Sequence, residues 1–192
     1  MRIIAGKHRG RALAAPEGSA VRPTSDRARE ALFDILAHGR FADRPVFEEA
    51  RVLDAFAGTG AFGLEALSRG AAHASFIEKD RAALKALSAN IKALGEERHA
   101  AVLPGDALHP PRPAAAASLA FLDPPYGEDV AAAALTALAE SGWLAPDALA
   151  VVEVAAKREV TAPPGFTLLE ERRYGAAKLA FLRFAPARGS WC

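Results

Sequence analysis

Four consecutive residues, Asp123-Pro124-Pro125-Tyr126, place a carboxylate, a backbone without hydrogen-bond donors and an aromatic ring directly after an apolar run. An exocyclic amine of a purine is a poor nucleophile because its lone pair is delocalised into the ring. The Asp123 carboxylate and the Pro124 carbonyl can accept the two amine protons and favour a pyramidal nitrogen. Consecutive prolines fix the backbone and donate nothing, and Tyr126 offers a face on which an extruded base can stack. The tetrapeptide therefore predicts a clamp for the amine of a nucleobase, with all four residues as its catalytic group.

A glycine-rich turn at residues 58–63 follows an earlier apolar segment and has the G-x-G-x-x-G spacing of a nucleotide-cofactor loop. Glu78 lies 20 residues after Gly58, where its carboxylate can accept hydrogen bonds from two vicinal ribose hydroxyls. Asp54, just before the turn, distinguishes two classes of cofactor. A carboxylate there would repel the pyrophosphate of NAD, but it would attract the ammonium and sulfonium groups of S-adenosylmethionine. The pattern favours S-adenosylmethionine, although Asp54 could instead cap the following turn.

Further cofactor contacts are expected where the neighbouring strands end. Asp106 ends the third expected strand, where it could meet an adenine amino group or simply cap the strand-to-loop turn. The predicted cofactor site comprises Asp54, Ala55, Gly58, Gly60, Glu78, Lys79, Asp106 and Ala107. Together with the clamp, this site predicts methyl transfer from S-adenosylmethionine to an amino nitrogen of a nucleobase.

Charge is unevenly distributed along a chain whose formal net charge is +1. The first 11 residues include Arg2, Lys7, Arg9 and Arg11 but no acid, which favours a segment that contacts nucleic-acid phosphates. The alternative is a solvated, frayed terminus. The single cysteine is Cys192 and the five histidines show no ligand spacing, so we expect neither a disulfide nor a metal site. Apolar runs are shorter than the roughly 18 residues of a membrane helix and no secretory signal is recognisable, so we expect a cytoplasmic protein without membrane partners.

Hydrophobic periodicity predicts strands that alternate with helices from residue 51 onward. Strands are expected at residues 51–56, 74–77, 101–103, 119–122 and 149–154, and helices at residues 26–38, 61–68, 80–94 and 130–141. This alternation implies right-handed crossovers and an α/β, doubly wound, mostly parallel sheet with helices on both faces. Two final strand-like runs, 166–173 and 178–184, have no helix between them and should pair antiparallel.

The chain divides into three predicted regions. Residues 1–40 form a basic appendage, with a β-hairpin in the first 20 residues and a helix that Thr24 or Ser25 caps. Residues 41–186 form the catalytic domain, and residues 187–192 form a tail.

Three further stretches narrow the interpretation to a family. Residues 1–11 read MRIIAGKHRGR, residues 22–33 read RPTSDRAREALF, and residues 53–70 read LDAFAGTGAFGLEALSRG. With the Asp123 clamp they resemble, in order and over nearly the whole chain, the RsmD-like bacterial methyltransferases. These enzymes modify the exocyclic amine (N2) of a guanine in small-subunit (16S) ribosomal RNA. The resemblance implies a Rossmann-like, class I S-adenosylmethionine-dependent methyltransferase fold and a base-flipped guanine of 16S rRNA within an assembling 30S particle.

The resemblance also implies RNA contacts. It suggests roles for Arg22 and Thr24 at the mouth of the active site, in addition to the basic residues Lys7, Arg9 and Arg11. A monomer is expected because no dimerisation stripe is present. Three other interpretations stay open. The first is a DNA adenine-amine methyltransferase, which would share the clamp but usually needs a separate recognition domain. The second is an NAD-dependent oxidoreductase, which has no use for the clamp. The third is a non-catalytic RNA-binding module.

Overall fold

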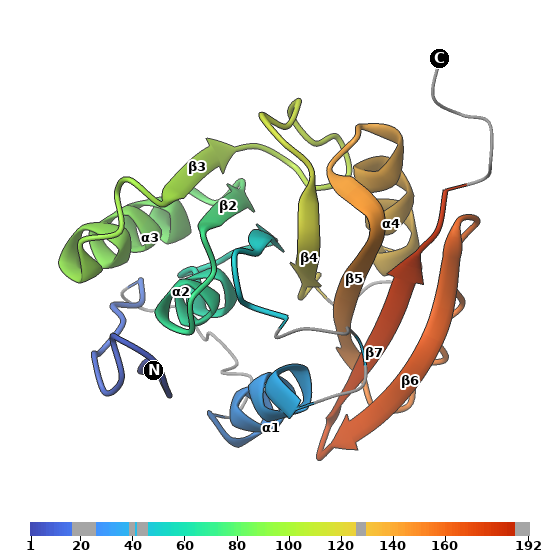
Figure 1. Ribbon diagram of the computed structural model, residues 1–192, viewed down its shortest axis with the longest axis horizontal. Helices are drawn as coiled ribbons and strands as arrows, with labels where there is room; N and C mark the ends of the chain where they lie inside the picture. Colours follow the sequence, from blue (N-terminus) through green and yellow to red (C-terminus); the bar gives the residue numbers. More distant parts are fainter. Residues whose placement is uncertain (17–25, 39–40, 42–45, 126–129, 187–192) are drawn as a thin grey trace.

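The computed structural model describes residues 1–16, 26–38, 41, 46–125 and 130–186, and in these ranges the chain forms one seven-stranded sheet with four helices (Figure 1). The strand order is β3-β2-β1-β4-β5-β7-β6. The first five strands are parallel, and β7 and β6 add antiparallel pairs at one edge. The prediction of a mostly parallel α/β sheet that ends in an antiparallel hairpin is therefore confirmed. No described helix is both long and apolar enough to cross a bilayer.

The elements follow the predicted order. The strands are β1 (Arg51–Ala55), β2 (His73–Glu78), β3 (Ala100–Pro104), β4 (Ala117–Leu122), β5 (Leu144–Ala155), β6 (Phe166–Tyr174) and β7 (Ala177–Phe184), and the helices are α1 (Asp26–His38), α2 (Ala61–Ser68), α3 (Arg81–Leu94) and α4 (Val130–Glu140). The main difference is β5, which begins at residue 144 rather than 149. Pro146 and Asp147 interrupt its apolar run, and the ladder accommodates them through a register shift with Asp147 at φ 62°. The expected N-cap of α1, Thr24 or Ser25, lies outside the described residues.

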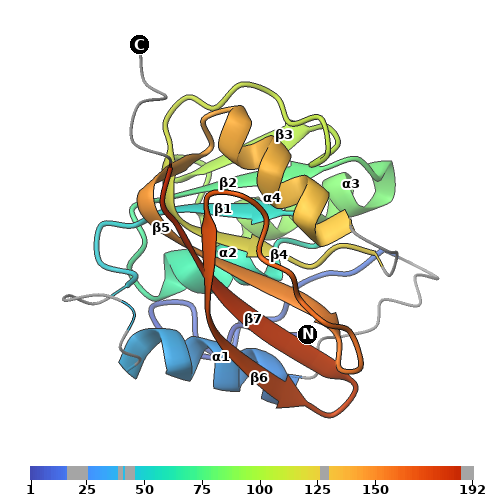
Figure 2. The same cartoon turned by 90° about the vertical axis from the view of Figure 1, so that its right-hand side faces the viewer.

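Apolar side chains cover both faces of the sheet. Helices α1, α2 and α3 lie on one face of the sheet and α4 lies on the other (Figures 1 and 2). Side chains of the first three helices share one core cluster with the sheet, and those of α4 share a second cluster. Within the first cluster, the Phe33 ring of α1 lies 6.3 Å from the Phe62 ring of α2 and 5.7 Å from the Phe121 ring of β4. Such aromatic pairs stabilise a fold by about 0.5–1.5 kcal/mol beyond the burial of their area. The helix predicted as part of an appendage thus packs into the common core.

The N-terminal segment is docked rather than frayed over the described residues 1–16. It forms a hairpin-like turn, with a β-bridge between Arg2 and Ala12. The buried Glu65 of α2 accepts hydrogen bonds from the backbone N–H groups of Ile4 (2.7 Å) and Ala5 (3.0 Å). A buried carboxylate needs such partners because an unpaired one costs several kcal/mol. The alternative of a solvated terminus is therefore wrong for this segment.

Candidate active site

The carboxyl ends of the parallel strands bring several acidic side chains to one edge of the sheet. The register of β2, β1, β4 and β5 aligns one set of paired residues across all four strands. Glu78, Asp123 and Glu153 are each the next residue after that set on their own segment. Asp54 lies one residue before the end of β1. Ligands of open α/β sheets bind at this edge. Glu153 was not among the residues predicted from the sequence, where its one signal is an acid inside the apolar run of β5.

The glycine-rich turn joins β1 to α2 at this edge. Gly60 is the N-cap of α2 and has φ 82°, and a Cβ atom there would lie 2.4 Å from the Leu87 Cδ1 atom. Glycine is therefore required at this position, both for the left-handed backbone and for packing against α3. Oδ2 of Asp54 accepts a hydrogen bond from the Gly63 N–H at 2.9 Å. The capping role that the sequence left open for Asp54 is thus present.

Asp54 is fully enclosed beneath the edge. Burial raises the pKa of its carboxyl group well above the usual value, although the Gly63 hydrogen bond opposes this effect. The negative charges of Asp123 and Glu78 raise the pKa of Asp54 further. The two negative neighbours disfavour ionisation of Asp54, so a positively charged ligand beside it would be stabilised.

The Glu78 carboxylate already has several backbone partners. Its Oε2 accepts from the Gly58 N–H at 2.7 Å, and its Oε1 accepts from the N–H groups of Lys79 and Asp80, each at 2.8 Å. A carboxylate has about four acceptor positions. These three bonds leave about one position, so the predicted contact with two ribose hydroxyls would require Glu78 to exchange a backbone bond.

Asp106 lies close to Glu78 because the N–H of the preceding residue, Gly105, donates to the Glu78 carbonyl at 2.9 Å. Its carboxylate accepts from the Leu108 N–H and from the Lys79 Nζ, each at 3.0 Å. The Leu108 hydrogen bond and then the Lys79 ammonium lower the pKa of Asp106. Asp106 therefore caps its turn, as the sequence also allowed, and a contact with adenine stays a prediction.

Two predicted contacts, Ala55 and Ala107, are buried in the apolar core beneath the edge. Neither presents a side chain that could donate or accept a hydrogen bond. Their roles as cofactor contacts therefore stay predictions, and they would depend on the main chain.

Asp123 directly precedes two residues that line a small cavity beside the strand ends. The cavity measures about 80 Å³, and its lining includes Pro124, Pro125 and Glu153. Asp123 itself keeps access to solvent, but the protein atoms around its carboxyl group make ionisation costly. This desolvation, followed by the negative charge of Glu153, raises the pKa of Asp123 to about 7. The fourth member of the predicted clamp, Tyr126, lies outside the described residues.

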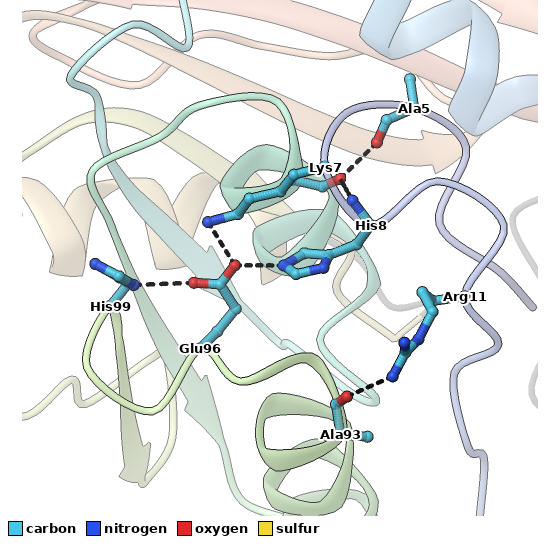
Figure 3. Close-up of polar contacts among 8 residues, drawn as sticks. Ala5, Lys7, His8, Arg11, Ala93, Glu96 and His99 are labelled. Carbon is cyan, nitrogen blue, oxygen red and sulfur yellow. Dashed lines mark hydrogen bonds and ion pairs between the residues drawn. The ribbon is translucent and has the colours of Figure 1, made fainter.

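The basic residues of the N-terminal segment lie elsewhere. Figure 3 shows Lys7 and His8 converging on the buried Glu96, with Lys7 Nζ 2.7 Å and His99 Nδ1 3.0 Å from its carboxylate. Burial alone would raise the pKa of Glu96, but the hydrogen bonds from Lys7 and His8 outweigh it and lower that pKa. His99 directly precedes β3, so this cluster lies at the amino ends of the strands, opposite the carboxylate edge.

Two other predicted RNA contacts on this segment differ in their surroundings. Arg11 donates from Nη2 to the Ala93 carbonyl at 2.7 Å and so helps to fix the segment on α3, whereas the Arg9 residue is exposed. Arg22 and Thr24 lie outside the described residues.

A buried asparagine that the sequence did not reveal links this segment to the glycine-rich turn. Asn90 of α3 is 2% exposed. Its Oδ1 accepts from the Ala14 N–H at 2.7 Å, and its Nδ2 donates to the carbonyls of Ala14 and Thr59, each at 3.0 Å. The side chain thereby fixes the N-terminal segment against the turn that begins α2.

Comparison with known proteins gives a consistent assignment over almost the whole chain. A family model described as conserved hypothetical protein 95 matches residues 1–183. Ribosomal RNA small subunit methyltransferase D of Escherichia coli (strain K12) is 39% identical over 177 residues, which cover 91% of this chain and 85% of that protein. The protein of the same name from Haemophilus influenzae is 36% identical over 179 residues, which cover 91% of this chain and 89% of that protein.

Solved structures agree with this assignment. The Escherichia coli protein yhhF is 37% identical, with a TM-score of 0.83 over 96% of this chain and 98% of that one. TrmN from Thermus thermophilus is 25% identical, with a TM-score of 0.63 over 82% of this chain and 48% of that one. The fold is the Rossmann-like fold of class I methyltransferases, as the sequence predicted. The chain belongs to the family described as conserved hypothetical protein 95, together with the ribosomal RNA small subunit methyltransferase D proteins.

Proposed function

We propose that this protein transfers a methyl group from S-adenosylmethionine to the exocyclic amine (N2) of a guanine in 16S rRNA, within an assembling 30S particle. The observation that carries the proposal is the position of Asp123 and Pro124 at the end of β4, on the same edge as the glycine-rich turn. Relatives named ribosomal RNA small subunit methyltransferase D support a ribosomal RNA substrate.

The acidic edge fits the proposed cofactor. S-adenosylmethionine carries an ammonium and a sulfonium, and when bound it supplies an electrophilic methyl group. Asp54, whose pKa is raised by burial and by neighbouring carboxylates, would hold its positive end. Glu78 would hold the ribose and Asp106 the adenine. A dinucleotide would instead bring a pyrophosphate to this edge, which argues against an NAD-dependent oxidoreductase.

The clamp acts by accepting hydrogen bonds from the guanine amine. The Asp123 carboxylate and the Pro124 carbonyl would each accept one amine proton, so that the nitrogen lone pair points out of the ring plane toward the methyl group. Pro124 and Pro125 hold this geometry because their rings restrict the backbone. Preorganised acceptors of this kind supply most of the acceleration in such a displacement. A strong general base is unnecessary because the methylated ammonium is acidic and loses its proton to solvent.

The basic segment would contact RNA phosphates away from the flipped base. Lys7 lies beside the amino end of β3, whereas the clamp lies at the carboxyl edge of the sheet. A five-residue strand such as β3 spans about 16 Å. An RNA that reached both places would cross α2 or α3. We propose that the protein acts as a monomer in the cytoplasm, where ribosomal subunits assemble.

The proposal is tested by incubating the protein with methyl-labelled S-adenosylmethionine and three acceptors. These are naked 16S rRNA, 30S subunits from a strain that lacks the activity, and duplex DNA. We expect label in rRNA or in 30S subunits, recovered as N2-methylguanosine after digestion to nucleosides. The Asp123→Asn variant, whose side chain has nearly the same size, should transfer at least about 100-fold more slowly.

The other outcomes separate the alternatives. Label only in duplex DNA, recovered as methylated adenine, would assign a DNA adenine-amine methyltransferase. No label in any acceptor, with retained RNA binding, would indicate a non-catalytic RNA-binding module. Binding of S-adenosylmethionine, measured by calorimetry without an acceptor, checks the cofactor separately from the reaction.

A further inference from the structure

Glu153 lies next to Asp123 on the neighbouring strand. The parallel ladder pairs Leu122 of β4 with Val152 of β5, so Asp123 and Glu153 follow the same rung. Adjacent strands are about 4.8 Å apart, so the backbones of these two residues are near neighbours. The effect of the Glu153 charge on the Asp123 pKa is consistent with this proximity.

Glu153 also borders the cavity whose wall contains the two prolines of the clamp. The lining includes Pro124, Pro125 and residues 152–155 of β5. Glu153 is 9% exposed and lies inside β5, a strand that pairs with β4 on one side and with β7 on the other. A side chain on such a rigid element holds its position well enough to select between ligands.

The chemistry of purines gives a second carboxylate a specific use. On guanine, the exocyclic amine at C2 is adjacent to a protonated ring nitrogen, N1–H, so this edge presents donors at two neighbouring positions. On adenine, the ring nitrogen next to the amine has no proton and is an acceptor. A carboxylate next to the one that holds the amine therefore accepts from guanine and repels adenine. A site built to accept a hydrogen bond rejects an analogue without the donor far more strongly than a merely apolar pocket does.

We propose that Glu153 determines the specificity for guanine by accepting a hydrogen bond from its N1–H while Asp123 holds the adjacent amine. This inference rests on the proposed guanine-N2 methyl transfer. Two neighbouring carboxylates repel each other, and a ligand that donates to both offsets this repulsion. The pair is therefore matched to an edge with two neighbouring donors, which guanine has and adenine lacks.

The test uses 2-aminopurine, which keeps the amine of guanine at C2 but has an unprotonated N1. Two RNA fragments are synthesised that differ only at the target nucleotide, one with guanine and one with 2-aminopurine. They are used as naked RNA or assembled into 30S subunits, according to which form accepts label in the first experiment. We expect the wild-type protein to prefer guanine by at least about 100-fold in kcat/KM. In Glu153→Gln the amide nitrogen can donate to the unprotonated N1, so the preference should fall at least about tenfold, with an absolute gain on 2-aminopurine.

Two further variants serve as controls. Glu159→Gln removes another carboxylate at the lining of the same cavity and should leave the preference unchanged. Glu153→Asp keeps the carboxylate and should keep the preference for guanine even if the rate falls. Thermal unfolding and calorimetry with S-adenosylmethionine check that each variant folds and binds the cofactor.

The outcomes are distinguishable. If Glu153→Gln lowers kcat/KM equally on both RNAs, so that the wild-type preference is retained, the role of Glu153 is overturned and the proposed function stays intact. The same conclusion follows if Glu153→Asp, folded and cofactor-bound, loses the preference. Failure of the wild-type protein to label the guanine RNA would instead overturn the proposed function, and the inference with it.

Discussion

The Glu78 carboxylate accepts a hydrogen bond from the Gly58 N–H at 2.7 Å, across 20 residues of chain. This bond ties the end of β2 to the glycine-rich turn after β1. It uses one of the acceptor positions that a ribose would need. Cofactor binding and the shape of the turn should therefore be coupled through one side chain.

Replacement of Glu78 by glutamine tests this coupling. The amide keeps the size of the side chain but replaces one acceptor oxygen with a donor, so either the Gly58 bond or a ribose contact is lost. We expect the Kd for S-adenosylmethionine to rise at least tenfold, which corresponds to about 1.4 kcal/mol. Isothermal titration calorimetry measures the change. Glu97→Gln, at an exposed residue after α3, is the matched control and should bind normally.

The pH dependence of methyl transfer should report the ionisation of Asp123. Its carboxyl group must be ionised to accept from the amine, and its pKa is raised to about 7 by desolvation and by the charge of Glu153. We therefore expect kcat/KM to rise about tenfold per pH unit below pH about 7 and to level off above it. In Glu153→Gln the midpoint should move to lower pH because one negative neighbour is gone. A pH profile that is flat from pH 5 to pH 8 would contradict this assignment.

The same carboxyl group should make the wild-type fold less stable as pH rises. Its pKa in the folded protein, about 7, is higher than the ordinary value of 3.8, so the folded state holds the proton more tightly than the unfolded state does. This favourable contribution is complete below pH about 4 and is lost between pH about 4 and pH about 7. Asp123→Asn lacks the titration, so its melting temperature relative to wild type should increase over that interval. An Asn variant whose relative melting temperature falls from pH 4.5 to pH 8 would contradict the shift.

A substitution at Gly63 tests the close packing of α2 on β2. Alanine normally stabilises a helix interior by about 1 kcal/mol relative to glycine. Here an added Cβ atom would lie 2.3 Å from Cε1 of Phe76, so we expect Gly63→Ala to destabilise the fold by about 1–3 kcal/mol. Urea unfolding measures the loss. The double variant Gly63→Ala/Phe76→Leu should be more stable than the sum of the single changes in the free energy of unfolding implies. If those changes add strictly, the added Cβ atom does not clash with Phe76.

Arg9 and Lys7 should respond differently to charge reversal. Arg9 is an exposed residue, so Arg9→Glu should weaken RNA binding and reduce its salt dependence without changing stability. Lys7 forms an ion pair with the buried Glu96, so Lys7→Glu should weaken RNA binding and also lower the free energy of unfolding. Filter binding over a range of salt concentrations and urea unfolding separate the two effects. An unchanged salt slope in both variants would show that this segment does not contact phosphates.

The sequence by itself determined the order of the elements and predicted acidic residues where the strands end, and the clamp stays a prediction. Helix and strand periodicity is local, and it predicted ten of the described elements closely. The conformational freedom of Gly60 and the rigidity of Pro124 and Pro125 are also properties of single residues. The exception was β5, where Pro146 and Asp147 hid the first part of the strand.

Only the tertiary structure decided which groups meet and how many bonds each of them makes. Glu153 became a candidate because the register of β4 with β5 places it beside Asp123. Asn90 joins Ala14 to Thr59 across 76 and 31 residues, and the Glu78 carboxylate is mostly used by backbone N–H groups. Strand register and hydrogen-bond saturation depend on segments far apart in the chain, so no local pattern of residue types contains them.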